Sequence, residues 1–253
     1  MKIAIVSGAS SGIGRELVKI IDKHCPMIDE IWVIARRKER LEQLQFKTGH
    51  PLRILAMDLS KEESLIRLKK LMDQKKPHIY VLAASAGFGK YGQNISQTFQ
   101  DATGMIDVNV RALTGLTQMS LPYMVKGGRI LLLSSSAAFV PQPGFSIYAA
   151  TKAYVLSYGR SLGQEMKKRG VHVTTVCPGP VKTEFFDHCG TGETLSAFKL
   201  FFMAQPEKVA RQAWRDTMKK KSLSVYGISM KSFRILSKAV PHRWLIKGMG
   251  LVL

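Results

Sequence analysis

Tyr148 and Lys152 are four residues apart, and side chains of these types could move a proton. On a helix, residues at this spacing project from the same face. A phenol with a pKa of about 10 is a poor proton shuttle at neutral pH, and a neighbouring ammonium stabilises the phenolate and lowers that pKa. Ser135 lies thirteen residues upstream, at the end of a predicted strand, where its hydroxyl can hydrogen-bond a substrate oxygen. Together the three residues predict proton exchange with a carbonyl or hydroxyl oxygen.

A glycine-rich turn near the N-terminus is suited to binding a dinucleotide. It reads Gly-Ala-Ser-Ser-Gly-Ile-Gly over residues 8–14, between a strand-like run and a helical pattern. Glycines permit a tight turn and a close backbone approach to a pyrophosphate, which then rests on the helix N-terminus. We assign cofactor binding in this turn to Gly8, Ser10, Ser11, Gly12, Ile13 and Gly14.

The end of the second predicted strand carries Arg36 and Arg37 and no carboxylate. An acidic residue at this position binds the ribose 2′-hydroxyl of NAD, whereas a basic residue accommodates the 2′-phosphate of NADP. A guanidinium presents paired donors that match a phosphate. The two arginines therefore predict NADP(H) as the cofactor.

These residues need a scaffold that brings the ends of several strands together. Short apolar runs alternate with segments whose apolar residues recur at helical steps, and the runs are apolar on both faces, as in a parallel sheet covered by helices. This alternation predicts a doubly wound, Rossmann-type α/β fold with about seven strands, in which ligands bind beyond the carboxyl ends of the strands. The predicted strands are 3–7, 31–35, 52–57, 79–83, 128–134, 171–177 and 223–226, and the predicted helices are 14–24, 39–46, 62–74, 105–124 and 148–169.

Further motifs, in their order and spacing over residues 3–183, resemble the short-chain dehydrogenase/reductase family. They are Gly8/Gly12/Gly14, Asp58-Leu59, Ala86-Gly87, Asn109, Ser135, Tyr148/Lys152 and Pro178-Gly179. The offset from Tyr148 favours Ser135 over Ser134 and Ser136 as the catalytic serine. Ser85 stands where the family usually has an asparagine, a departure that affects the hydrogen bond this asparagine makes to the sheet.

The resemblance implies where each half of the cofactor would bind. Asp58 would contact the adenine ring with Leu59 beside it, and residues 85–87 (Ser85, Ala86 and Gly87) would line the cofactor cleft. At the other end, the nicotinamide would be bordered by Pro178, Gly179, Val181 and Thr183, the last of which would bond its carboxamide.

The resemblance also implies a mechanism of carbonyl reduction. The bound NADPH supplies the hydride, Tyr148 donates the proton, and Ser135 steadies the developing oxyanion. Lys152 would adjust the pKa of Tyr148 and hold the nicotinamide ribose. Asn109 would hold a backbone kink and a water that connects Lys152 to solvent. The catalytic set is therefore Asn109, Ser135, Tyr148 and Lys152, in an enzyme that acts on CH–OH groups and needs no metal.

Composition narrows the classes of protein to which the chain can belong. No segment reaches the ~20 consecutive apolar residues that a membrane-spanning helix needs, and the N-terminus does not resemble a signal peptide. Cys25, Cys177 and Cys189 lack the spacing of metal ligands and are odd in number, which indicates reduced thiols. We expect a cytoplasmic protein that forms a homo-oligomer, a dimer or a tetramer.

The C-terminal residues 229–253 form a basic extension beyond the predicted domain of residues 1–228. The whole chain has a net charge of +20, and the segment from Thr217 to Leu253 has eight lysines and arginines and no acidic residue. Residues 229–240 repeat apolar side chains at helical steps, and Trp244 follows. Such a tail fits contact with a membrane surface, packing on its own substrate mouth or on a second subunit, or a solubilising role. Nucleic acid is disfavoured, because aliphatic and aromatic residues interrupt the basic ones and no nucleic-acid motif is present.

The segment 187–205 lacks clear sequence signals for the start or end of a strand or helix, and we predict that it is a mobile loop. Its apolar residues 197–204 indicate either a buried helix or an apolar lid, and a lid would imply a hydrophobic substrate of lipid, acyl or sterol type. Two other functions compete with the NADPH-dependent oxidoreductase: a non-catalytic nucleotide sensor on the same fold and a nucleic-acid binder. The complete set of Ser135, Tyr148 and Lys152 disfavours the sensor.

Overall fold

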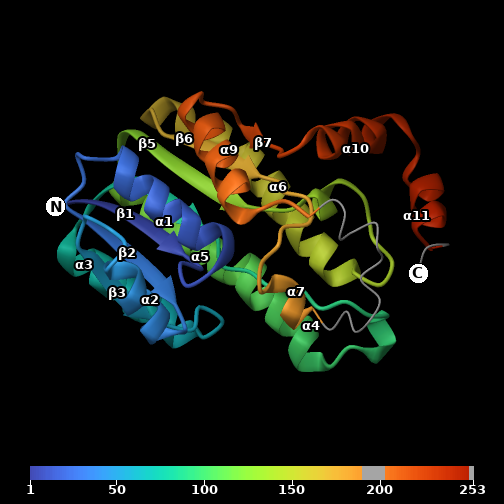
Figure 1. The fold of residues 1–253 in the computed structure, drawn as a ribbon, viewed down its shortest axis with the longest axis horizontal. Coiled ribbons are helices and arrows are strands. Elements are labelled where there is room, and N and C mark those ends of the chain that lie inside the picture. Colours follow the sequence, from blue (N-terminus) through green and yellow to red (C-terminus); the bar gives the residue numbers. More distant parts are fainter. Residues whose placement is uncertain (190–202, 251–253) are drawn as a thin grey trace.

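A parallel sheet of seven strands forms the centre of the protein in a computed structural model that describes residues 1–189 and 203–250 (Figure 1). The strand order is β3-β2-β1-β4-β5-β6-β7, and all neighbours run parallel. The predicted doubly wound fold is therefore confirmed. The strands are β1 (Lys2–Ser7), β2 (Glu30–Ala35), β3 (Leu52–Ala56), β4 (His78–Ala84), β5 (Met124–Leu133), β6 (His172–Val176) and β7 (Leu223–Ser224).

Helices cover both faces of the sheet, and successive residues of each inner strand face opposite layers. In β1, Ile3 and Ile5 pack into one buried cluster and Ala4 and Val6 into the other. This explains why the strand sequences are apolar throughout. One face is covered by α1 (Gly12–His24), α2 (Lys38–Gln45) and α9 (Pro206–Met218), and the other by α3 (Glu62–Lys75), α5 (Leu113–Ser120) and α6 (Ser146–Glu165).

The strand order reverses between β1 and β4: the chain adds β2 and β3 on one side of β1 and β4 to β7 on the other. A cleft is expected at the carboxyl ends of these two strands. A single hydroxyl connects the carboxyl ends of the two strands, because Oγ of Ser7 accepts hydrogen bonds from the backbone N–H of Ser85 (3.0 Å) and Ala86 (3.2 Å). Although Ser85 replaces the asparagine that is usual in the family, the two strands are still joined here by hydrogen bonds, and Ser7 provides the side chain that makes them. Ligands of such sheets bind at this switch point.

The prediction of one continuous helix over residues 105–124 is wrong. The structure has α4 (Phe99–Ile106), a π-helical turn (Asp107–Ala112) and α5, which ends before Pro122. Proline lacks the N–H that continues a helix, so the chain leaves the helix there and β5 begins at Met124. The strand starts earlier than predicted because Met124 pairs with Ile79 before an irregularity, after which Arg129 pairs with Val81.

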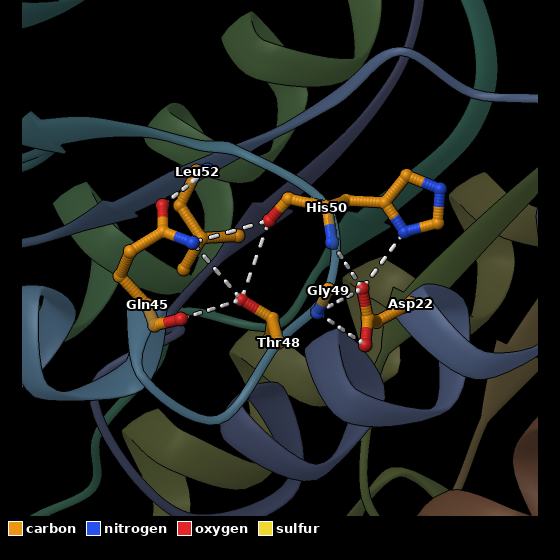
Figure 2. A network of polar contacts seen from close by, with 6 residues as sticks. All are labelled: Asp22, Gln45, Thr48, Gly49, His50 and Leu52. Carbon is orange, nitrogen blue, oxygen red and sulfur yellow. Dashed lines mark hydrogen bonds and ion pairs between the residues drawn. The ribbon is translucent and has the colours of Figure 1, made fainter.

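The loop between α2 and β3 is fixed by a polar network (Figure 2). Asp22 on α1 accepts hydrogen bonds from the backbone N–H of Gly49 and His50 and contacts Nδ1 of His50 at 2.7 Å. Burial raises the pKa of Asp22, but the hydrogen bonds outweigh this effect and hold it below its usual value. Gln45 donates to His50 O at 3.3 Å and accepts from the N–H of Leu52 at 2.6 Å. The network sets where β3 begins.

The C-terminal helices lie at one end of the molecule. Figure 1 shows α10 (Ile228–Ala239) and α11 (His242–Gly250) at the end opposite α2 and α3. Within the described ranges, no helix combines the length and the apolar character needed to cross a membrane. Most of the predicted mobile loop, including the apolar residues 197–202, lies outside the described residues. The domain boundary at residue 228 stays a prediction.

Candidate active site

A cavity of about 700 Å³ opens at the carboxyl ends of the strands. It is lined by every predicted cofactor residue except Asn109: Gly8, Ser10, Ser11, Gly12, Ile13, Gly14, Arg36, Arg37, Asp58, Leu59, Ser85, Ala86, Gly87, Tyr148, Lys152, Pro178, Gly179, Val181 and Thr183. The predicted catalytic Ser135 lines it as well. Residues spread over most of the chain therefore meet in one cleft.

The glycine-rich turn has no room for side chains. A Cβ on Gly14 would lie 2.3 Å from the carbonyl oxygen of Gly8, and a Cβ on Gly8 would lie 2.8 Å from the backbone nitrogen of Ala86. Gly8 and Gly12 also have positive φ values of 68° and 54°, which side chains disfavour. Helix α1 begins at Gly12 with no side chain capping its first turn. A close backbone and free helix N–H groups fit the pyrophosphate of a dinucleotide.

Tyr148 and Lys152 lie on one face of α6, beside Ser135 at the end of β5. Nζ of Lys152 lies 5.6 Å from the centre of the Tyr148 ring and donates to the carbonyl oxygen of Leu133 at 2.9 Å. Both side chains are buried, with residue exposures of 7% for Tyr148 and 4% for Lys152. Ser135 accepts a hydrogen bond from the backbone N–H of Ala137 at 3.1 Å, which orients its hydroxyl. The structure thus brings the predicted proton-transfer set together.

The pKa of Tyr148 differs from the expectation. Burial raises it well above its ordinary value, and a hydrogen bond with Ser135 lowers it only in part. Burial lowers the pKa of Lys152 to about 8. Desolvation disfavours the charged form of both groups, and the ammonium lies over the ring rather than at the hydroxyl. Tyr148 is therefore a neutral phenol at physiological pH, which is the form that donates a proton.

Asn109 lies behind the cavity in the π-helical turn and supports the site from there. Its side chain accepts from the N–H of Phe88 (3.0 Å) and donates to Phe88 O (2.8 Å) and to Oγ1 of Thr151 (3.1 Å). A Cβ on Gly87 would lie 2.8 Å from Oδ1 of Asn109 and 3.1 Å from Nζ of Lys152. Gly87 therefore permits the close approach of these two side chains.

The loop after β6 closes the cleft from the opposite side. A Cβ on Gly12 would lie 3.1 Å from Cγ2 of Thr183, so this loop comes close to the glycine-rich turn. Val181 bridges to Ala204, which fixes the backbone before Thr183. At the end of the cavity where the adenine is predicted, Asp58 accepts hydrogen bonds from the backbone N–H and the hydroxyl of Ser60, at 3.0 and 2.8 Å.

The two predicted arginines have different surroundings. Arg36 is exposed and, among the residues described, has no hydrogen-bond or ion-pair partner. Arg37 is paired with Glu184, with Nη1 2.6 Å from Oε2, and Arg40 contacts the other carboxylate oxygen of Glu184. Sequence reasoning missed Glu184 and Arg40, because no local motif signals a pair separated by more than one hundred residues.

An aromatic wall, which we define as Tyr91, Phe145 and Phe185, surrounds Tyr148. The Phe145 ring stacks on Tyr148 at 4.3 Å between centroids, and Phe185 lies 5.3 Å from it. Tyr91 contacts Phe145 from the outer side at 5.4 Å. Gly89, also missed from the sequence, lies against this group, and its Cβ would lie 2.8 Å from the Tyr148 ring. The side of the cavity next to Tyr148 is therefore aromatic.

The extension packs on the loops that border the cavity. A Cβ on Gly179 would lie 2.7 Å from Sδ of Met230, and the Phe233 ring lies 6.3 Å from that of Phe139. The helical repeat of apolar residues over 229–240 predicts Leu236 on the same face as Met230 and Phe233, but Leu236 is 48% exposed. The inner face of α10 thus contacts the subunit's own cleft walls, which was one of the alternatives.

The described residues contain no cluster of three or more histidine, cysteine or carboxylate side chains that could hold a metal ion. The three cysteines are buried free thiols. Burial raises the pKa of Cys25 and of Cys177 to about 11. These two thiols are therefore neutral and unreactive at physiological pH.

Comparison with known proteins agrees with this geometry. The family model described as short chain dehydrogenase matches residues 2–193. An uncharacterized oxidoreductase of Staphylococcus epidermidis is 29% identical over 194 residues, which cover 76% of this chain and 83% of that relative.

Two solved structures share the fold over most of their length. A short-chain dehydrogenase from Sphingobium yanoikuyae in complex with NADPH has a TM-score of 0.82 at 25% identity and covers 94% of this chain and 93% of its own. A closed form of serine dehydrogenase complexed with NADP⁺ has a TM-score of 0.77 at 26% identity and covers 88% and 94%. Both proteins hold a nicotinamide cofactor.

Proposed function

The chain belongs to the short-chain dehydrogenase family and acts as a nicotinamide-dependent oxidoreductase on CH–OH groups, and we propose that it uses NADPH to reduce uncharged, apolar ketones. One observation carries this proposal: Ser135, Tyr148 and Lys152 line one cleft between an arginine-rich end and the aromatic wall. Arg36 at the first end supports a 2′-phosphate. The second end supports an apolar substrate.

In the proposed mechanism, Tyr148 gives its proton to the carbonyl oxygen. Its raised pKa keeps the phenol protonated until the oxygen gains charge. The Ser135 hydroxyl donates a hydrogen bond to the same oxygen and stabilises the negative charge that develops there. When bound, the nicotinamide cofactor supplies the hydride. Lys152 holds the nicotinamide ribose, and Asn109 keeps the chain around residue 88 in place.

The aromatic wall supports the choice of an uncharged ketone. The cavity lining includes Phe88, Tyr91, Val108, Phe145, Phe185 and Phe186, with Gln142 as a neutral polar side chain, and Phe88, Phe145 and Phe185 pack in one cluster with Tyr148. A substrate carboxylate would lose its hydration there, which costs free energy unless a partner replaces the water. The test is a panel of aromatic and aliphatic ketones and matched keto acids, scored by loss of NADPH absorbance. We expect kcat/KM for the keto acids to be at least about tenfold lower, and equal values would contradict the substrate class.

The cofactor preference is tested by Arg36→Asp. An aspartate would repel the 2′-phosphate and accept hydrogen bonds from a free ribose hydroxyl. We expect the ratio of kcat/KM with NADPH to that with NADH to fall by about 100-fold, the sum of a lost charge-assisted bond and a new repulsion. Because Arg36 is exposed, the thermal midpoint of unfolding should not change. A parent protein that uses both cofactors equally well would contradict the NADPH proposal.

We further propose that the outer face of α10 and α11 binds an anionic lipid surface. This outer face is defined by exposed apolar residues and by basic residues that include Lys231 and Lys247; the apolar residues are Ile228 (84%), Ile235 (70%), Leu236 (48%) and Trp244 (61%). Two such all-positive faces would repel each other, which disfavours a symmetric contact between copies. Exposed apolar side chains on helices that also carry exposed basic side chains match the interfacial region of an anionic membrane.

Sedimentation with phosphatidylglycerol vesicles tests this binding. The protein should sediment at low salt and be released as the Debye length falls from about 30 Å at 0.01 M to about 3 Å at 1 M. Ile235→Ser with Trp244→Ser should weaken binding by at least about tenfold, since two apolar side chains no longer insert. Phe46→Ser, at a 90% exposed phenylalanine elsewhere, is the matched control. Equal loss in both variants, or a mass that shows assembly through this face, would contradict the proposal.

A further inference from the structure

Glu184 places a carboxylate at the end of the cleft where the 2′-phosphate is proposed to bind. Its Oε2 lies 2.6 Å from Nη1 of Arg37, and its Oε1 accepts from Arg40. Arg37 also donates from Nη2 to Oγ of Ser10 at 3.2 Å. A continuous chain of polar contacts therefore runs from the loop after β6, through Arg37, to the glycine-rich turn. The two arginines hold the pKa of Glu184 below its usual value, although its burial acts in the opposite direction.

The neighbours of Glu184 fix its position. On one side, the methyl group of Thr183 lies against Gly12. On the other, Phe185 begins α7 (Phe185–His188) and packs against Tyr148. The backbone of Glu184 is thus held from both ends by contacts within the cleft. The tertiary structure therefore presents the carboxylate of Glu184 to Arg37 and Arg40 from a held stretch of backbone.

The carboxylate and a 2′-phosphate require the same donors. Both are anions with oxygens that match the fork of a guanidinium, and two anions on one guanidinium repel each other. Arg36 is free to bind the phosphate, whereas Arg37 and Arg40 are engaged by Glu184. Binding of the phosphate to all three arginines would have to displace or share this carboxylate. A cofactor without the phosphate makes no such demand.

We infer that Glu184 is a specificity-determining residue: its carboxylate competes with the 2′-phosphate for Arg37 and Arg40 and reduces the preference for NADP(H) over NAD(H). This inference rests on the proposed NADPH dependence. Its size is limited by solvent, because the side chains of Arg37, Arg40 and Glu184 are 37%, 42% and 34% exposed. Partly exposed pairs are screened and weak, so we expect an effect of about fivefold, which falls as salt is added.

The test is Glu184→Gln, with nucleotide fragments measured by calorimetry. The fragments are adenosine 2′,5′-bisphosphate, which carries the 2′-phosphate, and adenosine 5′-monophosphate, which lacks it. The variant should bind the bisphosphate about fivefold more tightly at low salt and the monophosphate with unchanged affinity. In high salt the gain should shrink toward zero. The same pattern is expected for NADPH against NADH.

Glu63→Gln on α3 is the matched control, because it removes the same charge from an exposed residue outside the cavity. It should leave both affinities unchanged, and an equal gain there would overturn the inference in favour of a general charge effect. The inference would also be overturned if Glu184→Gln left the affinity for both fragments unchanged, or weakened both equally. Glu184 would then have a purely structural role. If the parent binds the monophosphate as tightly as the bisphosphate, the NADPH proposal itself fails, which is a separate result.

Discussion

Tyr148→Phe should lower kcat by about 10²- to 10⁴-fold, the range that a positioned general acid contributes, while the Kd for NADPH stays within about twofold. The substitution removes one hydroxyl and keeps the ring that stacks on Phe145 and contacts Phe185. The cleft therefore keeps its shape and loses only the proton donor. Kcat is measured with a ketone accepted by the parent, and the Kd by fluorescence titration with NADPH.

Tyr154→Phe is the control for this variant. Tyr154 lies on the same helix, is 39% exposed, and contacts the Thr114 hydroxyl at 2.9 Å, outside the cleft. The same loss of a hydroxyl there should leave kcat within about twofold, as for a surface substitution. Residual activity of Tyr148→Phe above about one tenth of the parent would remove Tyr148 from the role of proton donor.

Lys152→Met is expected to damage both catalysis and cofactor binding. Methionine keeps most of the side-chain volume in this buried position and removes the ammonium, so the effect of charge is separated from that of a cavity. We expect kcat to fall by about 100-fold and the Kd for NADPH to rise by about tenfold, because charge-assisted hydrogen bonds to the ribose are lost. An unchanged Kd would show that Lys152 does not hold the ribose.

The same residue predicts a pH dependence. Burial lowers the pKa of Lys152 to about 8, so its ammonium is charged below this pH and neutral above it. NADPH affinity in the parent should therefore decrease as the pH rises through about 8. The decrease should be absent in Lys152→Met, whose side chain does not titrate. Titrations of both proteins from neutral to alkaline pH check this, and a flat parent profile would contradict it.

The sequence by itself determined the fold class, the glycine-rich turn at residues 8–14 and the set of residues that meet in the cleft. These features depend on local rules. Strand sequences that are apolar on both faces specify a parallel sheet, and the glycines at residues 8–14 permit a tight turn before a helix. The four-residue step from Tyr148 to Lys152 specifies one helix face. Parallel strands then bring these elements to one edge of the sheet.

Only the tertiary structure decided the state of those residues. The pKa of Tyr148 is raised by burial in a pocket that Phe145 and Phe185 help to form, and the hydrogen bond with Ser135 opposes this rise only in part. Of two adjacent arginines, Arg37 is paired and Arg36 is not, because a loop 147 residues away returns with Glu184. Gly89 and Met230 likewise acquire their roles from contacts across the fold. Spacing along a chain predicts which face a side chain occupies, but its charge state and partners depend on groups that folding alone brings near.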